Sequence, residues 1–164
     1  MKKYYYFAYG SNMACSQIGE RCPDAEVVGP ARLPGYRLAF TRYSEGWRCG
    51  VADAVPCKGA DVWGVLYLIS DKDLIRLDDR EGYYGEGQGN AYVRRVGEVW
   101  LGGPDGEKRV PDVYIYFVAN PVFGERGEGA FKPGALYKTM MVRAAEHHGL
   151  PAAYVAMLKE LPTY

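Results

Sequence analysis

Short runs of apolar and β-prone residues, separated by glycine and proline, dominate the first two thirds of the chain. An aromatic run covers residues 4–9, and four more runs lie between residues 26 and 68. These four cover residues 26–33, 36–41, 50–55 and 61–68, and two later runs cover residues 92–100 and 113–118. Their length and close spacing predict antiparallel strands, with a turn at residues 102–106 between the last two.

The remaining pattern is helical. The clearest helix is predicted at residues 70–81, where Ser70 can cap the first turn, Asp73 follows three residues later and Gly82 can end the helix. A short helix is expected within residues 13–21. Two more are expected at residues 136–149 and 151–161, with Gly149 as a stop and Pro151 in the first turn.

This order of elements predicts an α+β fold. We expect a small curved sheet, mixed or antiparallel, or a partial β-barrel, flanked by two or three helices. The chain shows no internal repeat and no long linker, and 164 residues fit one domain, so a single domain is predicted over residues 1–164. The glycine-rich segments 82–89 and 123–134 are either flexible lids over a site or exposed connections.

Charge and composition favour a small-molecule partner. The chain has 20 basic and 20 acidic residues without a block of either sign, so neither nucleic acid nor a membrane surface is an expected partner. Gly10, Ser11 and Asn12 interrupt the N-terminal apolar run early, which predicts a cytoplasmic protein. The four cysteines form no C-x-x-C pair and are expected to be free, mostly buried thiols.

The turn at residues 9–13 is a possible binding element. A strand that ends in a tight turn and opens a helix leaves backbone N–H groups free to hold a carboxylate or an oxyanion. An ordinary turn capped by Ser11 or Asn12 is the alternative. Ser11 is a poor nucleophile candidate, because the G-x-S-x-G elbow is absent.

Glu81 is the strongest candidate for acid–base chemistry. It follows Leu74 and Leu77 at helical spacing, which places its carboxylate on the apolar face of the predicted helix. Partial loss of water and the nearby negative end of the helix would both raise its pKa toward neutrality. The alternative is a surface glutamate paired with Lys72, Arg76 or Arg80.

No metal site and no cofactor are predicted. Asp78, Asp79 and Glu81 fall on different helix faces, and no ligand loop or histidine completes the set. The adjacent His147 and His148 are expected to diverge around their helix as a solvated pair.

Several motifs, spaced along nearly the whole chain, resemble the γ-glutamyl cyclotransferase family. The N-terminal segment Tyr6, Phe7, Ala8, Tyr9, Gly10, Ser11, Asn12 and Met13 is similar to the substrate loop of that family, which usually ends in Leu where Met13 stands. The segment at residues 77–82 resembles the one that carries the catalytic glutamate. Residues 62–65, Tyr116 with Asn120, and the segment from Tyr137 to Pro151 match in the same order.

The resemblance implies an enzyme that converts a γ-glutamyl amide or amino acid to 5-oxoproline and a free amine without a cofactor. Glu81 would be its catalytic acid/base. Residues 6–13, Tyr116 and Tyr137 would bind substrate, the tyrosines by orienting Glu81 or the substrate through their hydroxyls. A γ-glutamyl hydrolase and a non-catalytic module that binds an amino acid or amide stay open. The leaving group also stays open, because the glycine-rich segments after Gly82 and Phe123 depart from the family pattern.

Overall fold

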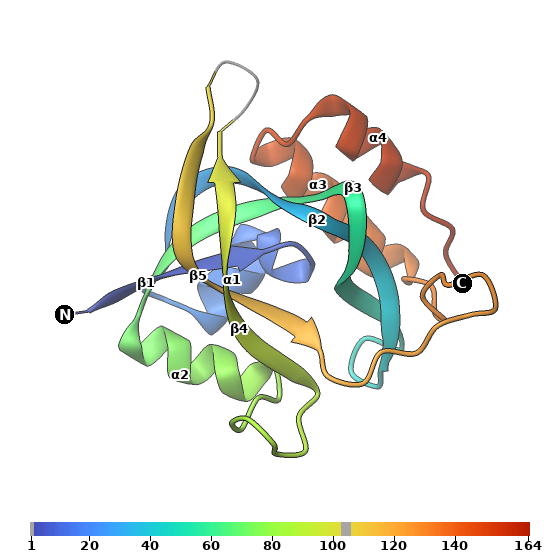
Figure 1. The fold of residues 1–164 in the computed structure, drawn as a ribbon, viewed down its shortest axis with the longest axis horizontal. Coiled ribbons are helices and arrows are strands. Elements are labelled where there is room, and N and C mark those ends of the chain that lie inside the picture. The colour runs from blue at the N-terminus through green and yellow to red at the C-terminus, as the bar shows by residue number, and fades with distance from the viewer. Residues whose placement is uncertain (1, 103–105) are drawn as a thin grey trace.

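The computed structural model describes residues 2–102 and 106–164, and its strands form a closed barrel in the order β1-β3-β2-β4-β5. The strands are β1 (Lys3–Ala8), β2 (Glu26–Ser44), β3 (Cys49–Ser70), β4 (Tyr92–Leu101) and β5 (Lys108–Val118). The helices are η1 (Ser11–Met13), α1 (Cys15–Arg21), α2 (Asp71–Arg80), α3 (Ala135–His147) and α4 (Ala152–Lys159). Figure 1 shows the strands curling around one another with helices packed outside them.

All neighbouring strands are antiparallel except β1 and β5, which run parallel and close the barrel. The parallel pairing joins Tyr5 to Val113 and Tyr6 to Tyr114. The predicted α+β fold with a curved, mixed sheet is confirmed. The predicted turn at residues 102–106 falls largely on residues 103–105, outside the described residues.

The four apolar runs between residues 26 and 68 belong to two long strands, β2 and β3, which pair from Glu26 to Ser44 (Figure 1). Of the three register shifts between β2 and β3, the one between Pro34 and Tyr36 falls where proline and glycine separate two runs. Gly35 has a φ of 81°, a conformation that costs glycine little. A β-bulge bends its strand and increases the local twist, which helps the sheet close on itself.

Helix α2 has the predicted ends. Ser70 accepts a hydrogen bond from the backbone N–H of Asp73, and the Asp73 carboxylate accepts one from the backbone N–H of Ser70. This capping box fixes where the helix begins. Leu74 and Leu77 are buried, and Gly82 follows the helix with a φ of 66°. The phase and the end of α2 are thus set locally, and they determine where Glu81 points.

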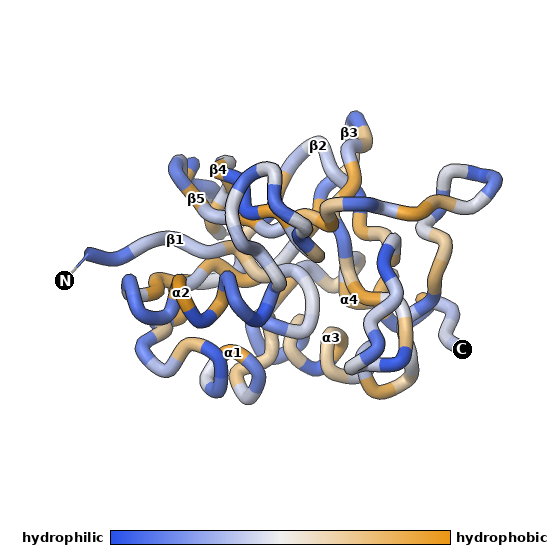
Figure 2. The backbone as a smooth tube through the Cα atoms, turned by 90° about the horizontal axis from the view of Figure 1, so that it is seen from below, coloured by the Kyte–Doolittle hydropathy of each residue, from blue (hydrophilic) through white to orange (hydrophobic). Residues whose placement is uncertain are grey.

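Figure 2 shows α1, α2 and α3 on one side of the strands. Apolar residues of the helices meet those of the barrel in one core, to which Ile18, Leu77, Met141 and Leu158 contribute from the helix side. Residues 13–21 divide into η1 and α1, because Ala14 is extended between them. In residues 2–102 and 106–164, no helix has the length and apolar character needed to cross a lipid bilayer.

Hydrogen bonds hold both glycine-rich segments. The segment 82–89 is held by the buried side chain of Asn90, which accepts a hydrogen bond from the backbone N–H of Tyr84 and donates one to the carbonyl of Gly85. The segment 123–134 is tied to the barrel by the N–H of Phe131, which donates to the carbonyl of Phe40. Of the first segment, Gly82 reaches the cavity described next.

Candidate active site

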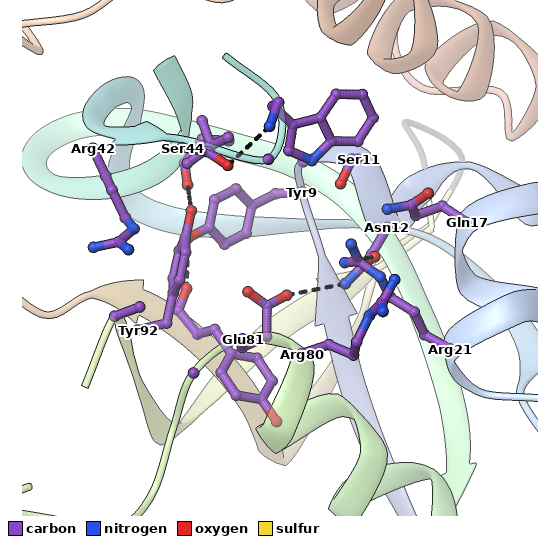
Figure 3. A pocket seen from close by; sticks show the side chains of 18 of the residues that line it. Tyr9, Ser11, Asn12, Gln17, Arg21, Arg42, Ser44, Arg80, Glu81 and Tyr92 are labelled. Atoms are coloured by element: carbon purple, nitrogen blue, oxygen red, sulfur yellow. Dashed lines mark hydrogen bonds between the residues drawn. The ribbon is translucent and has the colours of Figure 1, made fainter. Parts of the chain in front are cut away.

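A cavity of about 760 Å³ lies between the end of β1, the end of α2 and the barrel wall (Figure 3). Its lining is mixed: aromatic rings form the walls, and charged groups from α1, α2 and β2 reach into it. The lining residues are Tyr6, Phe7, Tyr9, Gly10, Ser11, Asn12, Gln17, Arg21, Arg42, Ser44, Gly46, Trp47, Val51, Ala52, Asp79, Arg80, Glu81, Gly82, Ala91, Tyr92, Tyr116, Leu136 and Tyr137. A volume of this size fits a small molecule.

Glu81 follows the last residue of α2 and points into the cavity (Figure 3). Its Oε1 accepts a hydrogen bond of 3.1 Å from Nδ2 of Asn12. The same nitrogen donates to the hydroxyl of Tyr6 at 2.9 Å, and Oδ1 of Asn12 accepts from Arg21 at 2.8 Å. Arg21 thus orients the amide of Asn12, which in turn holds Glu81.

Burial raises the pKa of Glu81 to about 7, and the negative charge of Asp78 adds to the rise. Arg21 and the hydrogen bond from Asn12 act in the opposite direction, because both stabilise the carboxylate. Glu81 keeps part of its surface open to the cavity, while its carboxyl group is surrounded by protein atoms. A carboxyl group with this pKa exchanges protons readily near neutral pH.

The alternative of a surface ion pair for Glu81 does not describe this geometry. In the described part of the chain, Glu81 forms no salt bridge with Lys72, Arg76 or Arg80. The charged groups that shift its pKa are Arg21 and Asp78. The apolar face predicted from helix phase is therefore the one on which the carboxylate lies.

Tyr116 and Tyr137 line the cavity, but their hydroxyls are used differently from the expected contact with Glu81. The hydroxyl of Tyr116 donates to Asp78, one turn earlier in α2, and Arg94 pairs with the other oxygen of that carboxylate. The hydroxyl of Tyr137 accepts from the backbone N–H of Ala52 at 3.1 Å. Burial raises the pKa of Tyr137 to about 12, so this hydroxyl stays neutral at physiological pH.

Gly10 allows the turn after β1 to approach Tyr137 closely. A Cβ atom at Gly10 would lie 2.8 Å from the Tyr137 hydroxyl oxygen and 3.1 Å from Cβ of Ala52. The first of these distances is too short for real atoms. A larger residue at this position would therefore displace the turn or the Tyr137 side chain.

Six of the eight residues of the predicted substrate loop line the cavity: Tyr6, Phe7, Tyr9, Gly10, Ser11 and Asn12. Ala8 and Met13 do not line it. Ala8 is buried with its carbonyl against Gly64 of β3, and Met13 is fully buried with its carbonyl accepting from Tyr67.

Sequence reasoning missed several lining residues. Arg21, Arg42, Trp47 and Tyr92 come from α1, β2, the β2–β3 connection and β4. Tyr92 donates to the carbonyl of Ala52 at 2.8 Å. No local pattern distinguishes these residues from other exposed or strand positions, because only the barrel topology brings them to one space.

The prediction that His147 and His148 diverge is wrong. His148 stands at the end of α3, and the two ring centroids are 4.9 Å apart at an angle of 80°. Nε2 of His148 lies 2.9 Å from the carbonyl oxygen of Met13, so this ring is held against the substrate loop. Of the four free cysteines, Cys22 and Cys49 are buried and Cys15 is exposed.

A closed barrel with one carboxyl group of raised pKa, set in a cavity beside a glycine turn, defines a site for a small molecule with acid–base capacity. A family model described as "Gamma-glutamyl cyclotransferase, AIG2-like" matches residues 6–139. The chain belongs to this γ-glutamyl cyclotransferase family. The matched range includes the turn after β1, Glu81, Tyr116 and Tyr137.

Relatives and solved structures agree with this assignment. The gamma-glutamylcyclotransferase of Mus musculus is 30% identical over 160 residues, which are 95% of this chain and 77% of the relative. That of Homo sapiens is 30% identical over 164 residues, covering 98% of this chain and 79% of the relative. A solved gamma-glutamyl cyclotransferase structure, 28% identical, superposes with a TM-score of 0.81 over 99% of this chain and 90% of its own.

Proposed function

We propose that this protein cyclises the γ-glutamyl group of a small γ-glutamyl amide, releasing 5-oxoproline and a free amine, with Glu81 transferring the proton. Membership in the family supports the cyclotransferase reaction. The observation that carries the role of Glu81 is its carboxyl group, which lies in the cavity with a pKa of about 7.

The reaction needs one group that first accepts and then donates a proton. In its charged form, Glu81 takes a proton from the α-ammonium of the substrate, and the freed amine attacks the γ-carbonyl carbon. A carbon–nitrogen bond closes the five-membered ring, and the original γ-amide carbon–nitrogen bond then breaks. Glu81 returns its proton to the departing nitrogen, and the ring nitrogen loses its second proton to solvent, which leaves the lactam N–H of 5-oxoproline. A pKa near the working pH suits both transfers.

Positioning supplies a large part of the acceleration. The attack is intramolecular, so holding the substrate in a folded-back conformation can contribute about 7–11 kcal/mol. The aromatic walls around Tyr9 and Tyr92 limit the conformations that fit. Neutral hydroxyls in these walls do not compete with Glu81 for the proton, since burial raises the pKa of both tyrosines.

The positive charges around the cavity suit the α-carboxylate of a γ-glutamyl group. Arg21, Arg42 and Arg80 line it, and the α-carboxylate of the substrate needs a positive partner or N–H donors. In this proposal the backbone N–H groups of the turn at residues 9–12 hold that carboxylate or the oxyanion of the reacting carbonyl. The N–H of Met13 is not among them, because it donates to the carbonyl of Gly10.

A panel of γ-glutamyl amides with different leaving groups tests the proposal, with 5-oxoproline and free glutamate both measured by mass spectrometry. The expected result is 5-oxoproline from the wild-type protein and its loss in Glu81→Gln. Free glutamate as the main product would establish a hydrolase instead. Binding without either product would establish a non-catalytic module.

We also propose that the protein is cytoplasmic, that it needs no cofactor, and that it binds neither nucleic acid nor a membrane. Turnover by protein treated with a metal chelator tests whether the reaction needs a metal cofactor.

A further inference from the structure

A second hollow, of about 380 Å³, lies between α1 and α3, beside the cavity of Glu81. Leu136 lines both spaces. Cys15, the first residue of α1, and His147 and His148, at the end of α3, meet at this hollow. Cys15 is 132 positions from His147 in sequence, and the packing of η1 against α3, with α1 directly after η1, brings it to the two histidines.

The three side chains have the spacing of a metal site. One ligand atom from each residue can be chosen so that all three lie within 4.8 Å of one another. Sγ of Cys15 lies 3.7 Å from Nε2 of His148. A tetrahedral zinc ion with Zn–S near 2.3 Å and Zn–N near 2.0–2.1 Å separates sulfur from nitrogen by about 3.5 Å.

We infer that Cys15, His147 and His148 bind a divalent transition-metal ion of the zinc type, with the fourth position open to the hollow. Thiolate and imidazole are the ligand types that zinc prefers. Cys15 and His147 are exposed, so small side-chain rotations can bring the atoms from their present spacing to ligand distance. The ion lies outside the cavity of Glu81 and takes no part in the proposed reaction.

The carbonyl of Met13 holds the ring of His148 beside Cys15. Nε2 is 2.9 Å from the carbonyl oxygen of Met13. The 3.7 Å spacing from Sγ of Cys15 is measured to the same Nε2, so ligation through Nε2 exchanges the hydrogen bond to Met13 for the metal. Ligation through Nδ1 would keep that bond, in the common arrangement where the second ring nitrogen donates to a backbone carbonyl.

The thiolate is essential to the charge balance of the site. Arg143 also lines the hollow, and its positive charge opposes a dication held by neutral groups alone. Binding therefore requires the Cys15 thiol to lose its proton to solvent, which leaves a net charge of +1 on the ion and its three ligands. At neutral pH the protein should release a proton when it takes up the metal.

Metal binding to the full chain, reduced and freed of metal, tests the inference. Zinc is titrated against a chromophoric chelator, and cobalt(II) is added separately to record thiolate-to-cobalt absorption in the near ultraviolet. We expect one equivalent of tightly bound metal and the thiolate band. Cys15→Ser and His147→Asn should each weaken zinc binding by more than about 100-fold, beyond the roughly 10–100-fold cost of losing an outer-shell contact.

Cys57→Ser is the matched control, because Cys57 is partly buried and lies on β3, away from the hollow. It should bind zinc like the wild-type protein. The two ligand variants leave the Met13 contact of His148 in place, and circular dichroism without metal verifies that they fold. The inference is overturned if no equivalent of zinc binds tightly, if all variants bind alike, or if cobalt gives no thiolate band.

Discussion

Nδ2 of Asn12 donates a hydrogen bond of 3.1 Å to Oε1 of Glu81, joining the turn after β1 to the end of α2. Arg21 fixes the direction of the amide by donating to its oxygen. The hydrogen bond stabilises the charged carboxylate, while burial favours the neutral acid. The balance of these two effects leaves Glu81 able to hold or release a proton near neutral pH.

Replacing Glu81 by Gln should reduce kcat for 5-oxoproline formation by about 10²–10⁴-fold, the usual range for loss of a general acid/base. Gln keeps an oxygen that can accept from Asn12, so the fold and substrate binding should persist. Steady-state kinetics and calorimetric binding of a slow substrate measure the two effects.

The matched control is Glu160→Gln. Glu160 follows α4 with φ −89° and ψ −3°, almost the conformation of Glu81 after α2, with φ −84° and ψ −3°. It is exposed and outside the cavity, so its variant should keep wild-type kcat. An active Glu81→Gln protein would refute the proposed role.

The rate should depend on the charge of Glu81. In the proposed mechanism its carboxylate accepts the first proton, so kcat/KM should rise with pH, with a midpoint near 7. Arg21→Gln removes a positive charge that lowers this pKa, so the midpoint should move to higher pH. Full pH–rate profiles of both proteins provide the measurement.

Arg76→Gln serves as the comparison for this charge change, since Arg76 is exposed on α2 and does not line the cavity. Its profile should coincide with that of the wild-type protein. A midpoint that stays fixed in Arg21→Gln would mean that Arg21 does not act on the titrating group.

The free energy of unfolding should also depend on the protonation of Glu81. The pKa of Glu81 is about 7 in the folded state against 4.5 as its ordinary value, so the folded protein binds this proton more tightly. The resulting stabilisation is fully present below pH 4.5 and is lost as pH rises through 7. It amounts to about 3 kcal/mol.

Urea unfolding of wild-type and Glu81→Gln proteins between pH 4 and 8 measures this contribution. The wild-type free energy of unfolding should fall relative to the variant across that window, so Gln stabilises the protein at pH 8. Glu160→Gln should show no such trend against wild type. Parallel pH curves for wild type and Glu81→Gln would contradict the raised pKa.

Gly10→Ala should destabilise the protein by about 1–3 kcal/mol, because the added methyl group meets the Tyr137 hydroxyl oxygen. Tyr137→Phe removes that oxygen, so the double variant should be more stable than the sum of the single effects predicts. Thermal unfolding of all four proteins completes the double-mutant cycle. Strict additivity would exclude the contact as the cause.

Gly19→Ala is the control for the same chemical change. Gly19 lies within α1, and a Cβ atom there meets nothing within 4 Å. Alanine has the higher helix propensity, so this variant should gain up to about 1 kcal/mol.

Local signals in the sequence were sufficient for α2. Ser70, Asp73 and Gly82 define its ends, and the spacing of Leu77 and Glu81 gives the direction of the carboxylate. These features depend on neighbours within a few residues, which is why they can be derived without the fold. The family motifs added the turn after β1 and the tyrosines.

Long-range pairing was not accessible in the same way. The contact of Asn12 with Glu81 spans 69 positions, and that of Tyr116 with Asp78 spans 38. The sequence offers several acidic groups near Asp78 to which the Tyr116 hydroxyl could donate a hydrogen bond. Only the folded barrel shows that the partner is Asp78. The approach of Cys15 to His148, across 133 positions, depends equally on how the helices pack.

The two shortest junctions of the barrel have a consequence for the site. In the described residues, β1 pairs with β5 at two positions and β2 pairs with β4 at two, whereas β2 and β3 are paired along most of their length. The barrel therefore consists of a three-stranded unit, with β1, β3 and β2, and a hairpin of β4 and β5. Asn12 follows β1 of the first unit, Tyr92 and Tyr116 belong to the second unit, and Glu81 lies on the segment that links the two units. A substrate that contacts both units acts as a clamp across these junctions, so its arrival should slow amide hydrogen exchange there more than within β2 and β3.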